Sequence, residues 1–165
     1  MKVISIDPGF ERVGIAVIEK TNTGEKLIYS ECFKTPASLP FNQRLLMIGG
    51  EINSVIKKHE PRIMAIETLF FTSNQKTAMG VAEARGVMVY QGALSGLDIR
   101  EYTPLQIKIA TTGYGKASKN QVMDMVKKLI HIKEKKEKLL DDEYDAIAIG
   151  LTCTASMNSE NRKSK

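Results

Sequence analysis

Three β-type segments joined by short turns open the chain and restrict its possible folds more than any other feature. Lys2 to Asp7 is apolar and stops at an Asp-Pro-Gly turn, Val13 to Lys20 is rich in branched residues, and Lys26 to Lys34 returns after a second turn. Sequential strands with such short connections pair as an antiparallel meander. We therefore expect the chain to begin with one side of a sheet.

Helical and strand patterns alternate after the meander. Strands are predicted at Arg62–Glu67 and Leu97–Tyr102. Helices are predicted at Phe41–His59, at about Ser73–Ser95 with Ser73 or Asn74 as its cap, from Thr103-Pro104, at Lys119–Ile130 and at about Asp141–Ala155. This order predicts an α/β fold with a mixed five-stranded sheet, an antiparallel meander plus parallel strands, flanked by helices. Residues 1–156 are expected to form one domain, and the polar tail 157–165 to be disordered.

Composition excludes several classes of protein. No segment approaches the ~20 apolar residues that span a membrane, and the first residues reach Asp7 too soon for a signal peptide, so a cytoplasmic protein is expected. Cys32 and Cys153 lie far apart and match no metal-ligand spacing, and His59 and His131 have no suitable neighbours. Any metal chemistry would therefore use oxygen ligands.

The positive charge of the chain is concentrated in one segment. The net charge is +5 overall, but Lys108 to Lys138 holds nine lysines against three acids, a net of +6, which leaves −1 for the remainder. A local excess of this kind is typical of a surface that binds phosphates. A solvated helix face without a partner gives the same pattern, so the segment alone does not decide between them.

Two carboxylates stand at the carboxyl ends of predicted hydrophobic strands. Asp7 ends the first strand and Glu67 directly follows Met64-Ala65-Ile66. A carboxylate at the end of a buried strand is costly unless it is paired or binds metal, and sites in open α/β sheets gather beyond such strand ends. There are alternatives to metal binding. Asp7 could simply form the turn before Pro-Gly, and Glu67 could be a charge that merely ends a strand.

A third acidic group begins the last helix. Asp142 and Asp145 are three residues apart and project from one side of a helix. Acids in a first turn also stabilise the helix N-terminus, which would explain Asp141 or Asp142 but not Asp145, which precedes an apolar run. Four acids without a histidine or cysteine cluster indicate Mg²⁺ or Mn²⁺. A pair of such ions, together with a basic segment, favours phosphodiester hydrolysis.

These motifs, taken in order, are similar to a known family. Ile6-Asp7-Pro8-Gly9, Glu67-Thr68-Leu69-Phe70, and Asp142 followed by Asp145-Ala146-Ile147-Ala148 resemble the RuvC family of Holliday-junction resolvases over roughly residues 1–155. The resemblance implies a ribonuclease H-like fold and cleavage of four-way junction DNA by a Mg²⁺-dependent homodimer that works with a branch-migration complex of the RuvA–RuvB type.

The resemblance also implies roles for individual residues. Asp7, Glu67, Asp142 and Asp145 fall on the catalytic, metal-binding acids of the family. Phe70 matches an aromatic residue that contacts bases near the crossover. Lys108 and Lys119 match basic residues that contact DNA, and 75–93 matches the helix that pairs across the dimer.

The chain departs from the family pattern next to its last acids. Glu143 and Tyr144 stand where small residues are usual, and Asp141 competes with Asp142 as the metal ligand. Another ribonuclease H-like nuclease, acting on RNA–DNA hybrid or precursor ribosomal RNA, has the same acid pattern and is the main alternative. An actin-like ATPase would need a second related domain, for which 165 residues leave no room. A catalytically inactive DNA-binding module would not retain four mutually repelling acids.

Overall fold

The computed structural model describes residues 1–69, 75–132 and 139–163. A central five-stranded sheet has the order β3-β2-β1-β4-β5, formed by β1 (Lys2–Asp7), β2 (Arg12–Thr21), β3 (Gly24–Lys34), β4 (Ile63–Glu67) and β5 (Asp98–Tyr102). The strands β1, β2 and β3 pair antiparallel, whereas β4 pairs parallel with both β1 and β5. The predicted mixed sheet, with a meander that joins a parallel portion, is confirmed.

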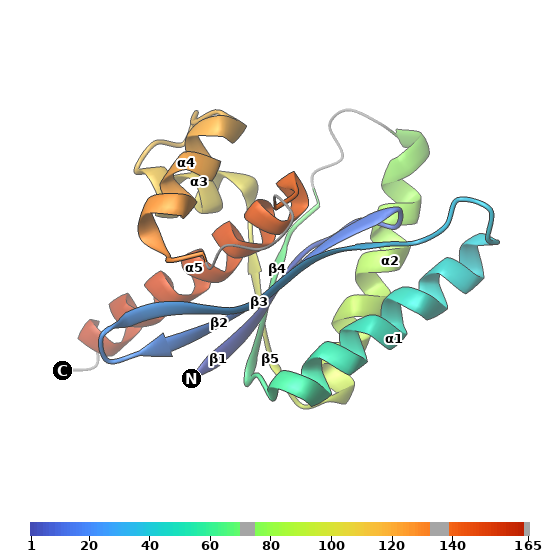
Figure 1. Ribbon diagram of the computed structural model, residues 1–165, viewed down its shortest axis with the longest axis horizontal. Helices are drawn as coiled ribbons and strands as arrows, with labels where there is room; N and C mark the ends of the chain where they lie inside the picture. Colours follow the sequence, from blue (N-terminus) through green and yellow to red (C-terminus); the bar gives the residue numbers. More distant parts are fainter. Residues whose placement is uncertain (70–74, 133–138, 164–165) are drawn as a thin grey trace.

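Helices cover both faces of this sheet (Figure 1). One layer holds α1 (Phe41–His59) and α2 (Gln75–Leu94), and the other holds α3 (Pro104–Thr112), α4 (Lys119–Leu129) and α5 (Asp141–Lys163). Each layer has its own buried core, because the side chains of each strand alternate between the two faces. Within the described residues, no helix combines the length and apolar character needed to cross a membrane.

The starts of α3 and α4 are fixed by their own sequences. The side chains of Thr103 and Ser118 each accept a hydrogen bond from the backbone N–H three residues on. The side chains of Gln106 and Gln121 in turn accept one from the backbone N–H of Thr103 and Ser118, so both helices begin with a capping box. The opening of a helix at Thr103-Pro104 and the start of another at Lys119 are thus as predicted. The predicted cap of α2, Ser73 or Asn74, lies outside the described residues.

The last helix is longer than its sequence pattern predicts. The expected end near Ala155 is wrong, because α5 continues to Lys163 and includes most of the tail that we expected to be disordered. Two features explain the extension. Met157 is buried in the core of the α3–α5 layer, and no glycine or proline interrupts the chain after Gly150.

Candidate active site

Asp7 and Glu67 end two neighbouring strands and lie on the same face of the sheet. In the parallel pairing of β1 with β4, Ile6 is opposite Ile66, so the next position of each strand carries an acid. Ile6 and Ile66 are buried in the core beneath α1 and α2. Because side chains alternate along a strand, Asp7 and Glu67 point to the opposite face, toward α5.

Helix α5 brings a third acid to this point. Asp145 lines a cavity of about 210 Å³ together with Asp7, Glu67, Lys108 and Lys119, and the rest of the wall is mostly apolar. The cavity lies at the carboxyl ends of β1 and β4, and its lysines come from α3 and α4. Three of the four predicted acids and both predicted lysines therefore share one site.

Burial and neighbouring negative charges raise the pKa of all three acids in this cavity. Burial, followed by the charges of Asp145 and Glu67, holds the pKa of Asp7 well above its usual range. Burial, followed by the charge of Asp145, raises the pKa of Glu67 to about 7, while Lys108 and Lys119 act in the opposite direction. Burial also raises the pKa of Asp145. Ionisation of these acids is therefore costly in the metal-free protein, and bound cations would offset that cost.

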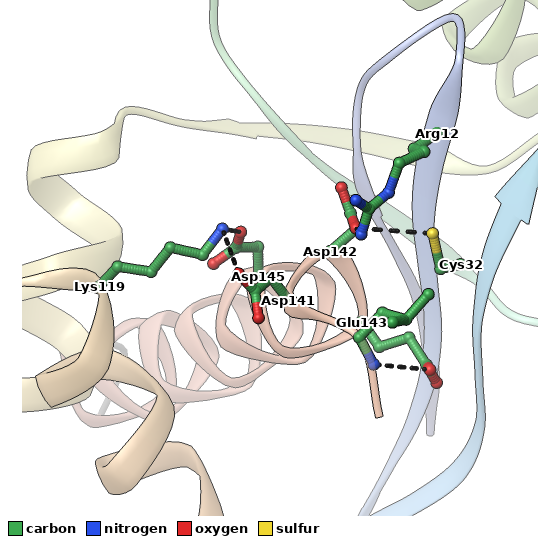
Figure 2. A network of polar contacts seen from close by, with 8 residues as sticks. Arg12, Cys32, Lys119, Asp141, Asp142, Glu143 and Asp145 are labelled. Atoms are coloured by element: carbon green, nitrogen blue, oxygen red, sulfur yellow. Dashed lines mark hydrogen bonds and ion pairs between the residues drawn. The ribbon is translucent and has the colours of Figure 1, made fainter. Parts of the chain in front are cut away.

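Lys119 pairs with two acids of α5, Asp145 and Asp141. Its Nζ lies 2.8 Å from Asp145 Oδ2 and 3.7 Å from Asp141 Oδ2 (Figure 2). The side chain of Lys119 is half exposed, so it can reach a ligand in the cavity as well as these carboxylates. A lysine in this place suits contact with a phosphate that enters next to the acids.

Asp142 faces a different neighbour. Its carboxylate pairs with the guanidinium of Arg12, and Cys32 Sγ donates a hydrogen bond to its Oδ2 at 3.5 Å (Figure 2). Asp142 is not among the side chains that line the cavity, but its charge contributes to the raised pKa of Asp7. Asp141 and Asp142, the two acids that compete as metal ligand, both raise the pKa of Asp145, so both act on the cavity.

Gly14 allows α5 to start this close to the sheet. It pairs with Asp7 across β1 and β2, and a Cβ at this position would lie 2.0 Å from the carbonyl oxygen of Asp142. Any larger residue would therefore overlap the backbone of α5. A glycine inside a strand often marks such a close backbone approach, so this signal was present in the sequence although the motifs did not include it.

The site residues suit a divalent cation, although they do not converge on one point. Over residues 1–69, 75–132 and 139–157, no three carboxylate, imidazole or thiol groups are close enough together to hold a metal ion. The contacts explain this spacing, because Asp145 is drawn to Lys119 and Asp142 to Arg12. The carboxylates with raised pKa values offer the hard oxygen donors that Mg²⁺ and Mn²⁺ prefer.

Glu143 and Tyr144, which depart from the family pattern near the last acids, are both buried. Glu143 accepts a hydrogen bond from Ser30 Oγ at 2.7 Å and from the backbone N–H of Leu140 at 3.2 Å, and the ring of Tyr144 is buried beneath α4. Both side chains anchor the start of α5.

Phe70, the predicted base-contacting residue, lies outside the described residues. Arg12 was missed because a cation five residues after Asp7 has no recognisable motif.

Fold and site together define a class of protein. A five-stranded sheet of this order, with acids at the ends of β1 and β4 and a third acid on the helix that crosses them, defines a ribonuclease H-like nuclease.

Comparison with known proteins narrows this class. The family model described as "Crossover junction endodeoxyribonuclease RuvC" matches residues 3–153. A protein of that name from Desulfitobacterium hafniense is 41% identical over 162 residues, which cover 98% of this chain and 97% of the relative. The chain belongs to the RuvC family of crossover junction endodeoxyribonucleases.

Solved structures agree with this assignment. Thermus thermophilus RuvC matches with a TM-score of 0.84 and 29% identity, covering 96% of this chain and 97% of that one. The same protein in complex with a Holliday junction substrate matches with a TM-score of 0.85 and 30% identity, covering 96% of each chain.

Proposed function

We propose that this chain resolves four-way (Holliday) DNA junctions during recombination and repair by Mg²⁺-dependent phosphodiester hydrolysis. The observation that carries the proposal is the cavity in which Asp7, Glu67 and Asp145 face two lysines. The Thermus thermophilus relative, solved with a Holliday junction substrate, supports this choice of DNA. Asp142 completes the proposed set of metal-binding acids.

Each part of the site has a proposed task. Two bound Mg²⁺ ions, for which Mn²⁺ can substitute, would supply an activated water and charge stabilisation at the leaving oxygen. Asp142 would exchange its contact with Arg12 for metal, and Lys108 and Lys119 would hold the scissile phosphate against the acids. Phe70 would stack on an unpaired base at the crossover.

We also propose that the enzyme is a homodimer that pairs through α2. The inner side of α2 is buried against the sheet, but Met79, Tyr90 and Leu94 on its outer side are 70%, 62% and 68% exposed. Together with Glu83 and Gly86 they form an exposed stripe at helical spacing. A two-fold dimer would provide two equivalent sites for the two strands of a junction.

The RuvA–RuvB type partner and the cytoplasmic location remain predictions.

The test compares three substrates in one experiment. Wild-type protein is incubated with a synthetic four-way junction, a linear duplex of the same sequence and an RNA–DNA hybrid, each with Mg²⁺, Mn²⁺, Ca²⁺ or chelator. We expect paired nicks in the junction with Mg²⁺ or Mn²⁺, and no cleavage with Ca²⁺ or chelator. Preferential cleavage of the hybrid would favour the other class of ribonuclease H-like nuclease, and cleavage in chelator would contradict the metal-dependent mechanism.

Asp7→Asn supplies the matched control for this assay. The amide keeps the shape of the side chain but loses the negative charge, so we expect cleavage to be abolished. Binding to the junction, measured by gel shift in Ca²⁺, should remain close to that of the wild type because the lysines are unchanged. Loss of binding together with cleavage would indicate that Asp7 has a structural role.

A further inference from the structure

The end of β4, which carries Glu67, is held from two sides. On one side, the backbone N–H of Thr68 donates to the carbonyl oxygen of Tyr102 in β5 at 2.9 Å. On the other side, Nε of Arg85 donates to the carbonyl oxygen of Glu67 at 3.0 Å. Arg85 belongs to α2, so a helix of the opposite layer reaches the backbone of a residue in the acidic cavity.

Arg85 is itself firmly placed. Its neighbours in α2, Ala84 and Met88, are fully buried in the core beneath that helix. Its Nη2 lies 2.7 Å from Glu101 Oε2 of β5, at an angle outside hydrogen-bond geometry, so this contact is an ion pair. The side chain of Arg85 is 19% exposed and that of Glu101 is 49% exposed, so the hydrogen bond to Glu67 is the better shielded of the two contacts. A planar guanidinium with donors in fixed directions is well suited to join two strands and a helix.

This contact constrains the direction of the Glu67 side chain. A hydrogen bond to the carbonyl oxygen fixes the plane of the following peptide and therefore the orientation of the Cα–Cβ bond of Glu67. Metal-binding groups must be held within about 0.5 Å of their working position, and the residues that orient them are commonly one contact removed from the metal. Arg85 does not line the cavity, so it would act through Glu67.

We propose that Arg85 is a positioning residue that holds Glu67 in the acidic cavity from helix α2 and touches neither metal nor DNA. The inference rests on the proposed role of Glu67 as a metal ligand. Helix α2 would then have two roles: its exposed stripe would form the dimer contact, and its Arg85 would orient part of the active site.

The test measures Mn²⁺ affinity by calorimetry and by electron paramagnetic resonance, with no DNA present. Arg85→Gln removes the ion pair and the fixed donor, and we expect Mn²⁺ to bind roughly 10–100-fold more weakly, the usual effect of losing an orienting partner. Arg85→Lys keeps the charge next to Glu101 but not the planar donor, so its affinity should be intermediate. Arg62→Gln is the matched control, since Arg62 is exposed and precedes the opposite end of β4.

A double-mutant cycle then identifies the residue through which Arg85 acts. If Arg85 works through Glu67, adding Arg85→Gln to Glu67→Gln should cause little further loss of Mn²⁺ affinity. A full additional loss in that background would overturn the proposal. Wild-type Mn²⁺ affinity in folded Arg85→Lys and Arg85→Gln proteins would also overturn it.

DNA assays separate this inference from the proposed function. We expect Arg85→Gln to bind a four-way junction in Ca²⁺ as the wild type does, but to cut it more slowly in single-turnover reactions with Mg²⁺. If the wild type fails to cut junctions, the proposed function is wrong, whereas the Mn²⁺ cycle still decides whether Arg85 positions Glu67. Equal loss of junction binding and cleavage in Arg85→Gln would contradict a role confined to Glu67.

Discussion

At the scale of single residues, Glu67 combines two opposing requirements. Burial and the charge of Asp145 raise its pKa to about 7, yet a metal ligand must be ionised. Sequence reasoning identified Glu67 and Asp7 because each acid stands at the carboxyl end of an apolar strand. It did not identify the pairing of Asp142 with Arg12, since the two residues are 130 positions apart and meet through the tertiary fold.

The raised pKa of Glu67 predicts that metal binding depends on pH. Below pH 7 the carboxyl group is protonated in the metal-free protein, so Mn²⁺ must displace a proton. We expect the apparent Mn²⁺ affinity to rise by about ten-fold per pH unit below pH 7 for this one group, and to level off above it. Calorimetry from pH 6 to pH 8 measures the slope. An equally steep slope in Glu67→Gln would assign the proton to another acid.

The raised pKa of Glu67 also predicts that this carboxylate lowers the stability of the metal-free protein at neutral pH. Because the pKa of Glu67 is raised from 4.5 to about 7 on folding, the folded state binds the proton more tightly than the unfolded state. Its contribution to stability is present at low pH and is lost as the pH rises toward 7. Glu67→Gln should therefore be more stable than the metal-free wild type at pH 8, by about 1–2 kcal/mol after screening.

Thermal unfolding in chelator at two pH values checks this expectation. At pH 4 the acid is neutral in the folded wild type and largely neutral in the unfolded chain, so the two proteins should unfold at nearly the same temperature. A less stable Glu67→Gln protein at pH 8 would contradict the sign of the pKa shift.

At the scale of elements, the approach of α5 to the sheet decides the shape of the site. Gly14 in β2 leaves space for the backbone of Asp142, and Ser30 in β3 binds Glu143 in the first turn of α5. Because side chains alternate along a strand, Asp7 and Glu67 lie on the face opposite Ile6 and Ile66. The place where α5 crosses that face depends on side-chain packing between distant segments, which no local pattern contains.

Gly14→Ala is expected to disturb both stability and activity. The added methyl group would overlap the carbonyl group of Asp142, so α5 must shift, at a cost of about 1–3 kcal/mol. Because α5 carries Asp142 and Asp145, cleavage should fall together with thermal stability. Gly50→Ala is the matched control, because its Cβ would meet no atom within 4 Å and alanine favours a helix. Equal activity in the two variants would contradict the close approach that we describe.

At the scale of the whole molecule, the sheet separates two tasks. The two helical layers lie on opposite faces of the sheet (Figure 1). The α3–α5 layer supplies the lysines of the cavity, whereas the α1–α2 layer carries the exposed stripe of α2. Arg85 links α2 to the sheet, since it belongs to α2 and contacts the backbone of Glu67 at the end of β4. The resemblance matched 75–93 to a helix that pairs across a dimer, but the sequence did not say which side of that helix the sheet would cover.

Tyr90→Glu tests the proposed dimer. A carboxylate in place of the Tyr90 ring would have to be buried against the second copy, so we expect sedimentation velocity to show a monomer. Such a monomer should nick junctions without coordinating the second cut. Leu129→Glu places the same charge on α4, in the other helical layer, and should leave the mass unchanged. A monomeric wild-type protein at micromolar concentration would contradict the dimer directly.

The sequence by itself determined the order of the elements, the meander, and the two acids at the ends of β1 and β4, because strand periodicity and turn residues are local properties of the chain. Only the tertiary structure decided that α5 reaches Lys163, that Asp142 faces Arg12 while Asp145 faces Lys119, and that Arg85 supports Glu67. These features depend on contacts between segments far apart in the chain, where packing and charge, and not local propensity, select the arrangement.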